Sequence, residues 1–508
     1  MSRSSAASRL TQAFRDRRPN IVHSPSAFDR ARPPAEPSPR LKGNLGTGGL
    51  LLTALALNAP LAMMAGFMPV QIGLGLGSAT PLVFLVVMVL VLVFAVGLVT
   101  MARHMRQPGA YYTYITAGLG RIPGLGAGFL ALTGYLLLGC GSYVLSAILA
   151  DNLFHGFLHG PSLPWWLWAV VVWGLVTVLS LFNIDVSTKV LGVFLCIEVA
   201  IVLIWDARVL ANGGPQGLGL DVTAQLGTGS PGVALLFGVA SLIGFESLQV
   251  FRAETHNPFR TIPRASYLTV VCLAGFYALG SYSYLVAFGT GPALASAASP
   301  AASFLGSLGQ YAGAVVRDLA NVMLLTSAFA ALLAIHNITA RYCFTLGRDG
   351  VLPTWLGRVN SRHHSPTQAA AAVALAIFVP LALVAVLHVN PVTAYVAMAG
   401  LGIWTAILLM FVTSFAVVLF FRNRPGLESS TWKTWTAPSL AVIGFGCVVA
   451  QATLNSGVLI GGSSAVATCC ILAVVAVAVA AMLYAAWLQT GRPHTWARIG
   501  EQDGQAVE

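Results

Sequence analysis

Long apolar runs alternate with short polar segments along most of the chain. A helix of about twenty apolar residues crosses the ~30 Å hydrocarbon core of a membrane. Because backbone polar groups cannot stay unpaired in lipid, runs of this length must be helical. The pattern predicts twelve membrane-spanning helices, at about residues 48–74, 80–102, 122–150, 164–183, 190–208, 231–252, 265–288, 316–342, 367–388, 392–421, 435–456 and 464–488.

The composition indicates the same fold class, an all-α polytopic membrane protein. Of the 508 residues, 57% are hydrophobic and 8% are charged, which excludes an ordinary soluble protein. The seven cysteines have no metal-ligand or disulfide spacing, so no metal or cofactor is predicted. There is no HExxH motif or nucleotide-binding loop, so an enzyme is not predicted either. A channel, which would line its pore with rings of polar residues, and a membrane enzyme are the distant alternatives.

Lysine and arginine residues indicate how the spans are oriented. With a cytoplasmic N-terminus, all of them except Arg208 and Arg317 fall in or beside predicted cytoplasmic segments. The positive-inside rule therefore predicts that both termini are cytoplasmic. It also explains the net charge of +11 without a nucleic-acid partner. Residues 1–45, which are rich in proline and arginine, are interpreted as a disordered cytoplasmic tail that could touch anionic lipid.

Two of the predicted spans contain helix-breaking residues. The first holds "NAPLAMMAGFMP" (58–69), in which Pro60 lacks the backbone donor that a helix needs. Five spans later, "LLFGVASLIGFESLQVF" (235–251) carries Gly238 and Gly244. Simple kinks or close helix packing would explain either segment alone. Interrupted helices at matching positions of two halves are typical of secondary transporters, which is the interpretation we prefer.

An interrupted helix exposes backbone groups to a ligand. Carbonyl groups are freed at the end of one half, and N–H groups at the start of the next. Carbonyls suit an ammonium group or cation, whereas N–H groups suit a carboxylate. Paired breaks therefore predict a small zwitterion or amine as the ligand.

Three further segments carry a family resemblance. "QPGAYYTYITAGLGRIPGLGAGF" (107–129), "GFESLQVFRAETHNPFRTIPRA" (244–265) and "ARYCFTLGRDGVLP" (340–353) resemble conserved blocks of the amino acid–polyamine–organocation permeases, in the same order and spacing. The resemblance covers about residues 45–425. It implies the LeuT-type fold, a five-plus-five inverted repeat with interrupted helices 1 and 6. The implied divisions are the tail (1–45), a transporter core of ten helices (46–425), two additional helices (426–490) and a cytoplasmic C-terminal tail (491–508).

The resemblance also implies a substrate site built largely from backbone. At the first break it implies carbonyls near Ala59 and Pro60, and beyond Leu61 the N–H groups of Ala62, Met63 and Met64. At the second break the implied carbonyls are those of Ala240, Leu242 and Ile243, next to Gly244. Tyr135 on the third span could border the ligand or be an ordinary core aromatic.

This chain departs from the family pattern at the first break. The family's Gly-Ser-Gly signature is replaced by Ala62, Met63 and Met64, so a hydroxyl and the clearance of two glycines are lost. A bound carboxylate would be held less well, which makes an amine without one more plausible. Alternatively, the loop is shifted towards Gly66.

Three polar residues are candidates for ion coupling. Glu198 stands where many relatives have a lysine, and a carboxyl at membrane depth is costly to charge and usually functional. It could take up and release a proton, or be a protonated glutamate bonded between helices. Glu246 could act in the same way or cap the broken helix. Ser327, with Thr326, stands where sodium-coupled relatives have hydroxyl ligands, although such hydroxyls commonly bond their own backbone.

Basic and acidic loop residues could form a charge network at an inner gate, although topology alone would also place arginines there. They are Arg252, Glu254, Arg341, Arg348, Asp349 and Arg358.

The predicted function is secondary active transport of an amino acid or related small amine across the cytoplasmic (inner) membrane by alternating access. Coupling to a proton is preferred. Substrate exchange and a polyamine or alkanolamine permease of the same fold are the alternatives.

Overall fold

The computed structural model describes residues 46–105, 111–181, 184–360 and 365–500, so the predicted tail at 1–45 lies outside it. Its secondary structure is helical, and no strand is found in these ranges. The longer helices are α2 (Thr47–Leu57), α5 (Thr80–Arg103), α7 (Arg121–Asp151), α8 (Trp165–Leu181), α9 (Ile184–Asn212), α10 (Pro231–Ala240), α11 (Pro258–Phe288), α13 (Pro300–Tyr311), α14 (Ala314–Arg348), α15 (Thr367–Val386), α16 (Pro391–Arg422), α17 (Ala437–Leu454) and α19 (Ser464–Gly491). The shorter elements are α3 (Pro60–Ala62), η2 (Met63–Phe67), α4 (Met68–Leu74), η3 (Gly77–Ala79), α6 (Tyr111–Leu119), η4 (Asn152–Phe157), η5 (Phe245–Glu254), α12 (Thr290–Ala295), η6 (Ser296–Ala298), η7 (Thr354–Gly357), η8 (Trp432–Thr436), α18 (Ser456–Ile460) and α20 (Pro493–Arg498).

Within the described ranges, nine helical segments are long and apolar enough to cross a membrane. They are Thr47–Leu74, Gly77–Arg103, Arg121–Phe157, Pro258–Phe288, Ala314–Arg348, Thr367–Val386, Pro391–Arg422, Trp432–Leu454 and Ser464–Gly491. The three other predicted spans correspond to α8 with 17 residues, α9 with 29, and α10 followed by η5. The fold is thus that of an all-helical polytopic membrane protein, whereas twelve spans and an inverted repeat stay predictions.

Helix α5 illustrates why these segments fold as they do. Pro81 lies in its first turn, where a missing N–H costs nothing. Phe84 and Val87 are buried against the protein, whereas Val86 and Val89 are each 57% exposed. A helix that is apolar on all sides is stable when one face packs on protein and the other on lipid.

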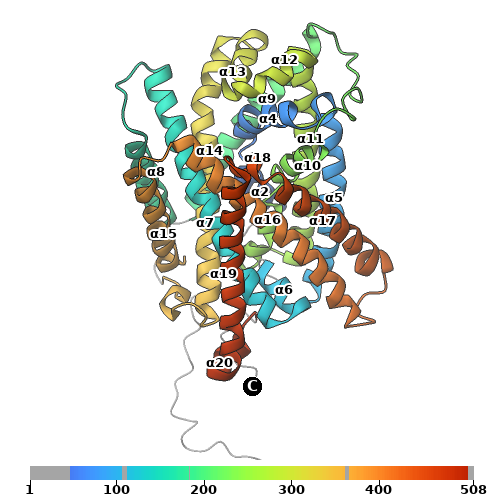
Figure 1. Ribbon diagram of the computed structural model, residues 1–508, viewed down its shortest axis with the longest axis vertical. Coiled ribbons are helices and arrows are strands. Elements are labelled where there is room, and N and C mark those ends of the chain that lie inside the picture. The colour runs from blue at the N-terminus through green and yellow to red at the C-terminus, as the bar shows by residue number, and fades with distance from the viewer. Residues whose placement is uncertain (1–45, 106–110, 182–183, 361–364, 501–508) are drawn as a thin grey trace, which may run out of the picture. The chain divides into compact units, whose positions relative to one another are not determined.

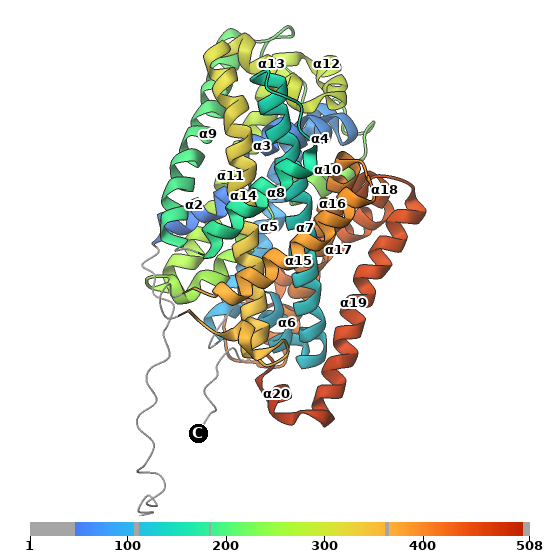
Figure 2. The ribbon, with the colours of Figure 1, turned by 90° about the vertical axis from the view of Figure 1, so that its left-hand side faces the viewer.

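The helices pack in long pairs, with α16 and α14 along α7, and α11 along α5. Figures 1 and 2 show α12 and α13 at one end of this bundle, and α6 and α20 at the other. The largest buried cluster includes Leu61, Met64, Leu242 and Ile243. Both predicted breaks therefore lie among packed core residues.

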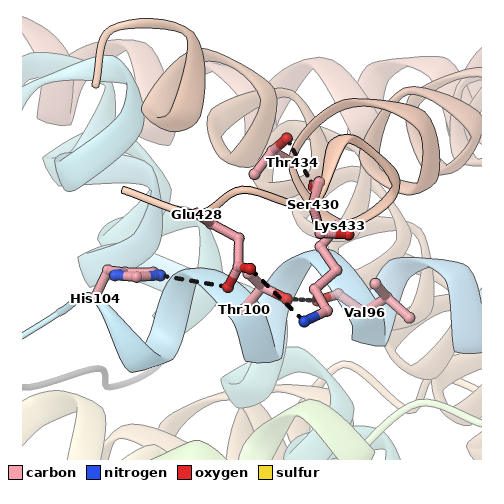
Figure 3. A network of polar contacts seen from close by, with 7 residues as sticks. All are labelled: Val96, Thr100, His104, Glu428, Ser430, Lys433 and Thr434. Atoms are coloured by element: carbon pink, nitrogen blue, oxygen red, sulfur yellow. Dashed lines mark hydrogen bonds and ion pairs between the residues drawn. The ribbon is translucent and has the colours of Figure 1, made fainter. Parts of the chain in front are cut away.

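Glu428 connects the end of α5 to the segment that begins α17 (Figure 3). Its carboxylate lies 3.8 Å from Lys433 Nζ and 3.9 Å from His104 Nε2, the latter an ion pair only when the imidazole is protonated. Thr434 donates to the Ser430 carbonyl at 3.1 Å and starts the next helical turn. These contacts fix the loop between α16 and α17 at the α6–α20 end.

The C-terminal segment 493–500 packs on the same end, and we call it the C-terminal clasp. The Gly500 N–H donates to the Tyr112 hydroxyl at 2.8 Å and to Asp349 Oδ2 at 3.2 Å, and the Tyr112 hydroxyl donates to Asp349 Oδ2 at 2.7 Å. Arg121 donates to the Ala497 carbonyl at 3.0 Å. The clasp thus joins α6 and α7 to the end of α14, where a cytoplasmic tail at 491–508 was predicted.

Asp349, expected in an arginine network, has Tyr112 and the clasp as its hydrogen-bond partners. Burial raises the pKa of Asp349 to about 6, against the opposing effect of the Tyr112 hydrogen bond. Arg348 and Arg498 act on the carboxylate only more weakly. The guanidinium of Arg341 stacks on the Phe251 ring, with 4.2 Å to its centroid. The Arg252 and Glu254 side chains are outside the described part of the chain.

Candidate functional site

The first predicted span is interrupted just before Pro60. Helix α2 ends at Leu57, and Ala59 has a left-handed conformation with φ of 43°. Pro60 then starts α3 as its first residue, a position that suits proline. The Met63 N–H donates to the Ala59 carbonyl at 3.0 Å, so these two groups are already bonded to each other. A π-helical turn, η2, follows.

The second span is interrupted between α10 and η5. Four residues separate the two elements, and Gly244 has φ of 117°, which L side chains rarely adopt. The Leu242 N–H donates to Val239 at 3.0 Å, and the Ile243 N–H donates to Ala240 at 3.3 Å. The end of α10 therefore has hydrogen bonds between residues three apart, as in a 3₁₀ turn, before the helix is interrupted.

The two breaks lie against each other. A Cβ added at Gly244 would come within 2.3 Å of Leu57 Cδ2 and 3.6 Å of Asn58 Nδ2. Further along the same spans, the Phe67 and Phe237 rings pack edge to face at 5.8 Å between centroids. The two interruptions, which are 186 residues apart in the sequence between Asn58 and Gly244, thus lie side by side.

Glu198 bridges the first break to two other helices. It lies on α9 and is 1% exposed. Its Oε2 accepts a hydrogen bond of 2.6 Å from the Ser327 hydroxyl on α14, and the Leu61 backbone N–H also bonds the carboxylate. Thr326, in contrast, donates to the Met323 carbonyl of its own helix at 2.9 Å. The structure therefore brings together three of the predicted residues, Glu198, Leu61 and Ser327.

Glu246 lies just past the second break among three tyrosines. Its Oε2 accepts the Gly244 N–H at 2.8 Å, and its Oε1 accepts the Tyr135 hydroxyl at 3.3 Å. Tyr111 of α6 and Tyr342 of α14 complete the group, with the Tyr135 and Tyr342 rings 5.5 Å apart. Glu246 thus satisfies a donor of its own unwound segment, which is the geometry of a cap.

The methionines at the first break are accommodated by a glycine on α11. A Cβ at Gly280 would come within 2.6 Å of Met64 Cε, so Met64 fills the room that the glycine leaves. Met64 is fully buried, whereas Ala62 and Met63 are half-buried. No atom lies within 4 Å of the position that a Gly66 Cβ would occupy. The loop therefore keeps open space beside Gly66 rather than beside Met64.

A sequence model described as "Amino acid permease" matches residues 48–488. The chain belongs to the amino acid permease family. This confirms the resemblance to the amino acid–polyamine–organocation superfamily, and the permease is not expected to be an enzyme. It is 30% identical over 218 residues to the branched-chain amino acid permease BcaP of Lactococcus lactis, covering 42% of this chain and 43% of that protein.

Two other relatives differ in what their names say they carry. The low-affinity putrescine importer PlaP of Escherichia coli is 24% identical over 275 residues, which are 52% of this chain and 59% of that protein. The aromatic amino acid transport protein AroP of Escherichia coli is 26% identical over 212 residues, which are 40% and 46%. The permease therefore spans about half the length of the curated relatives that it matches.

Several residues at the site were not predicted from sequence. Tyr111 and Tyr342 lie within quoted family blocks, but nothing in their spacing indicates that they meet at Glu246. Asp206 could have been found, because it is an acidic residue inside an apolar run, as Glu198 is.

Proposed function

We propose that the permease is a secondary active transporter of an amino acid or related small amine, which it moves across the cytoplasmic membrane by alternating access. The packing of Gly244 on Leu57 and Asn58 carries this proposal, because it joins two interrupted helices at one point. The twelve spans, the inverted repeat and cytoplasmic termini belong to the same proposal.

The substrate site in this proposal is the backbone around the two breaks. Carbonyls of Ala59, Pro60, Ala240, Leu242 and Ile243 would receive an ammonium group. The N–H groups of residues 62–64 would receive a carboxylate, although the Met63 N–H already donates to Ala59. Relatives named for branched-chain and aromatic amino acids and for putrescine support an amine as the common feature.

A proton is the proposed coupling ion, and Glu198 is its proposed carrier. Glu198 touches α3 and α14 from α9, so a change in its charge alters contacts among three elements. Glu246 instead accepts hydrogen bonds from the Gly244 N–H of its own segment and from the Tyr135 hydroxyl of α7. Exchange of substrate for product stays the alternative energetics, with the same site.

A binding screen on purified protein tests the substrate class. A ligand stabilises the folded state by mass action, so amino acids, polyamines and alkanolamines are compared by thermal shift at pH 5.5 and 7.5 and at increasing concentration. A concentration-dependent shift with α-amino acids would support the full backbone site. A shift with amines alone would support a site without carboxylate binding, and no shift with any of them would contradict the proposal.

A transport assay in proteoliposomes tests the location. Ala62→Trp should abolish uptake of the ligand found in the screen, because the indole fills the space beside the first break. Val86→Trp, on the exposed face of α5, is the matched control and should transport normally. Normal uptake by Ala62→Trp would refute the site, and a steady conductance without substrate would favour a channel.

A further inference from the structure

A second buried carboxyl lies on the same helix as Glu198. Asp206 is 1% exposed, and neither of its carboxyl oxygens has a hydrogen-bond partner among the described residues. The Ser283 hydroxyl, which is fully buried on α11, faces it without closing a hydrogen bond of normal geometry. Buried polar groups are normally hydrogen-bonded, since burying one without a partner is energetically costly. This pair therefore needs a proton or a small ligand between its members.

No charged side chain compensates Asp206. Apart from burial, only the Ser283 hydroxyl acts on the Asp206 carboxyl. No charged residue of the described parts of α9, α11 and α14 does so, and these residues are Glu198, Arg208, Arg260, Arg264, Arg317, Asp318, Arg341 and Arg348. On α11 its polar neighbours are Ser283 and Tyr284, and on α13 Ser307 is occupied by Trp205 Nε1 at 3.0 Å. A carboxylate without a cation is costly at membrane depth, which favours the protonated form of this group.

Asp206 and Glu198 both lie on α9 where this helix packs against α11, and we call this contact between the two helices the seam. Eight residues of helix separate them, which corresponds to about 12 Å. On α11, Tyr277 faces Glu198, is fully buried, and has no hydrogen-bond partner for its hydroxyl in the described ranges. Ser283 lies on the same helix further along, opposite Asp206. The seam thus contains two carboxyls, those of Glu198 and Asp206. It also contains two hydroxyls without hydrogen-bond partners among the described residues, those of Tyr277 and Ser283.

Asp206 lies towards the α12–α13 end of the bundle. The loop after α9 is tied to α12, because the Thr290 N–H donates to Gln216 Oε1 at 3.1 Å, and both views place this end opposite α6 and α20 (Figures 1 and 2). Trp205 and Phe304 of α13 pack at 5.1 Å between ring centroids beside it. Asp206 is therefore between Glu198 and the membrane face that α13 covers.

We infer that Asp206 and Ser283 form a second proton-binding site, through which protons reach Glu198 from the α12–α13 face. The Asp206 carboxylic acid gives its proton to a water molecule in the seam, and the Glu198 carboxylate takes one up by way of the Tyr277 hydroxyl. One O–H bond breaks at Asp206 and one forms at Glu198, so charge is conserved. The inference rests on the proposed proton coupling and extends it to a route.

The test uses full-length protein in proteoliposomes with a ligand identified by the thermal-shift screen. Asp206→Asn keeps the size of the side chain but cannot donate the proton, so uptake driven by a pH gradient should fall by about tenfold or more. Counterflow exchange without a gradient, and the thermal shift with ligand, should stay at the wild-type level. Asp206→Glu should restore much of the gradient-driven uptake.

Ser266→Ala is the matched control. Ser266 is also a buried α11 residue whose hydroxyl has no partner among the described residues, but it lies seventeen residues from Ser283 and outside the seam. It should transport as the wild type does, whereas Ser283→Ala should reduce gradient-driven uptake. If both serine variants behave alike, Ser283 has no part in a proton site and the inference is wrong.

Infrared difference spectra on raising the pH give a readout independent of transport. The wild type should lose a protonated carboxyl band that Asp206→Asn lacks and Glu198→Gln retains. The inference would be overturned if Asp206→Asn gave the same difference spectrum as the wild type and normal gradient-driven uptake. Coupling through Glu198 would then remain intact. Wild-type uptake that ignores the pH gradient would instead refute the proposed coupling, and the route with it.

Discussion

The two interrupted spans are held open by different means. At the first break, Ala59 adopts a left-handed conformation and the carboxylate that bonds the next N–H comes from Glu198 on another helix. At the second, Gly244 provides the unusual φ and the carboxylate comes from Glu246, two residues along the same segment. One break therefore depends on a neighbour, and the other is capped from within.

Under the proposed function, this difference predicts different roles for two similar carboxyls. Protonation of Glu198 changes contacts among α3, α9 and α14, which gives the first break a connection to the surrounding helices. Protonation of Glu246 changes its bond to the Gly244 N–H of its own segment and its bond to the Tyr135 hydroxyl of α7, while Tyr111 and Tyr342 beside it come from α6 and α14. We therefore expect proton coupling to depend on the first break, and the folded geometry of the site to depend on the second.

The largest effect on stability is expected from Gly244→Ala. The substitution forces an alanine to φ of 117° and places a Cβ 2.3 Å from Leu57, so the free energy of unfolding should fall by about 2–4 kcal/mol. Thermal unfolding of purified protein measures this. Gly66→Ala is the control, since its Cβ meets no atom within 4 Å and alanine favours helix. Equal loss in both variants would mean that the second break does not need glycine.

Ser327→Ala should have the next largest effect. It removes the 2.6 Å hydrogen bond to the buried Glu198 carboxylate, at a cost of about 1–3 kcal/mol. Thr326→Ala removes a bond to its own helix and should cost less, about 0.5–1 kcal/mol. Thermal unfolding of the two neighbours side by side is the measurement. If Thr326→Ala were the more damaging change, Glu198 would not depend on Ser327.

Asp349 provides a carboxyl outside both breaks. Its pKa is raised from 3.8 to about 6 by burial, so the folded state binds this proton more tightly than the unfolded state does. Proton binding by Asp349 therefore adds to the free energy of unfolding. This contribution is fully present below about pH 4 and is lost as the pH rises through about 6, on the order of 2–3 kcal/mol in all. Asp349→Asn should remove this part of the dependence of Tm on pH, because an amide does not ionise. Parallel pH curves for the variant and the wild type would contradict a buried, titrating Asp349.

Ala59→Gly should have the smallest effect and the opposite sign. Glycine adopts the left-handed conformation without the strain of about 1–2 kcal/mol that alanine has there. It also makes the unfolded chain more flexible, which favours unfolding. The free energy of unfolding should therefore be unchanged or rise by up to about 1 kcal/mol. The same change inside a regular helix would cost about 1 kcal/mol. A measured loss of that size would therefore place Ala59 in continuous helix and remove the first break.

Parts of this arrangement could be predicted from the sequence because they follow from backbone chemistry. Pro60 lacks an N–H, so a break beside it was expected and is confirmed. Gly244 marks the second break for a related reason, its tolerance of positive φ. That Ala59 rather than a glycine takes the left-handed conformation could not be predicted, because packing decides it.

Contacts between distant segments were the hardest to predict. Tyr111, Tyr135 and Tyr342 meet at Glu246 only through tertiary packing, and the same holds for the contacts of the C-terminal clasp. Its Ile499 is buried in one cluster with Leu125 of α7 and Leu346 of α14, and Trp496 packs against that cluster. The criterion that indicates Glu198, an acidic residue inside an apolar run, also applies to Asp206, which lies near the end of the predicted span at 190–208.

The most direct measurement compares Glu198→Gln with Glu246→Gln in proteoliposomes, under a pH gradient and in exchange without one. Glu198→Gln should lose accumulation driven by the gradient while it retains ligand binding and exchange, and Glu246→Gln should still accumulate substrate in response to the gradient. Gradient-driven accumulation by Glu198→Gln at the wild-type level would contradict a coupling role for the first break.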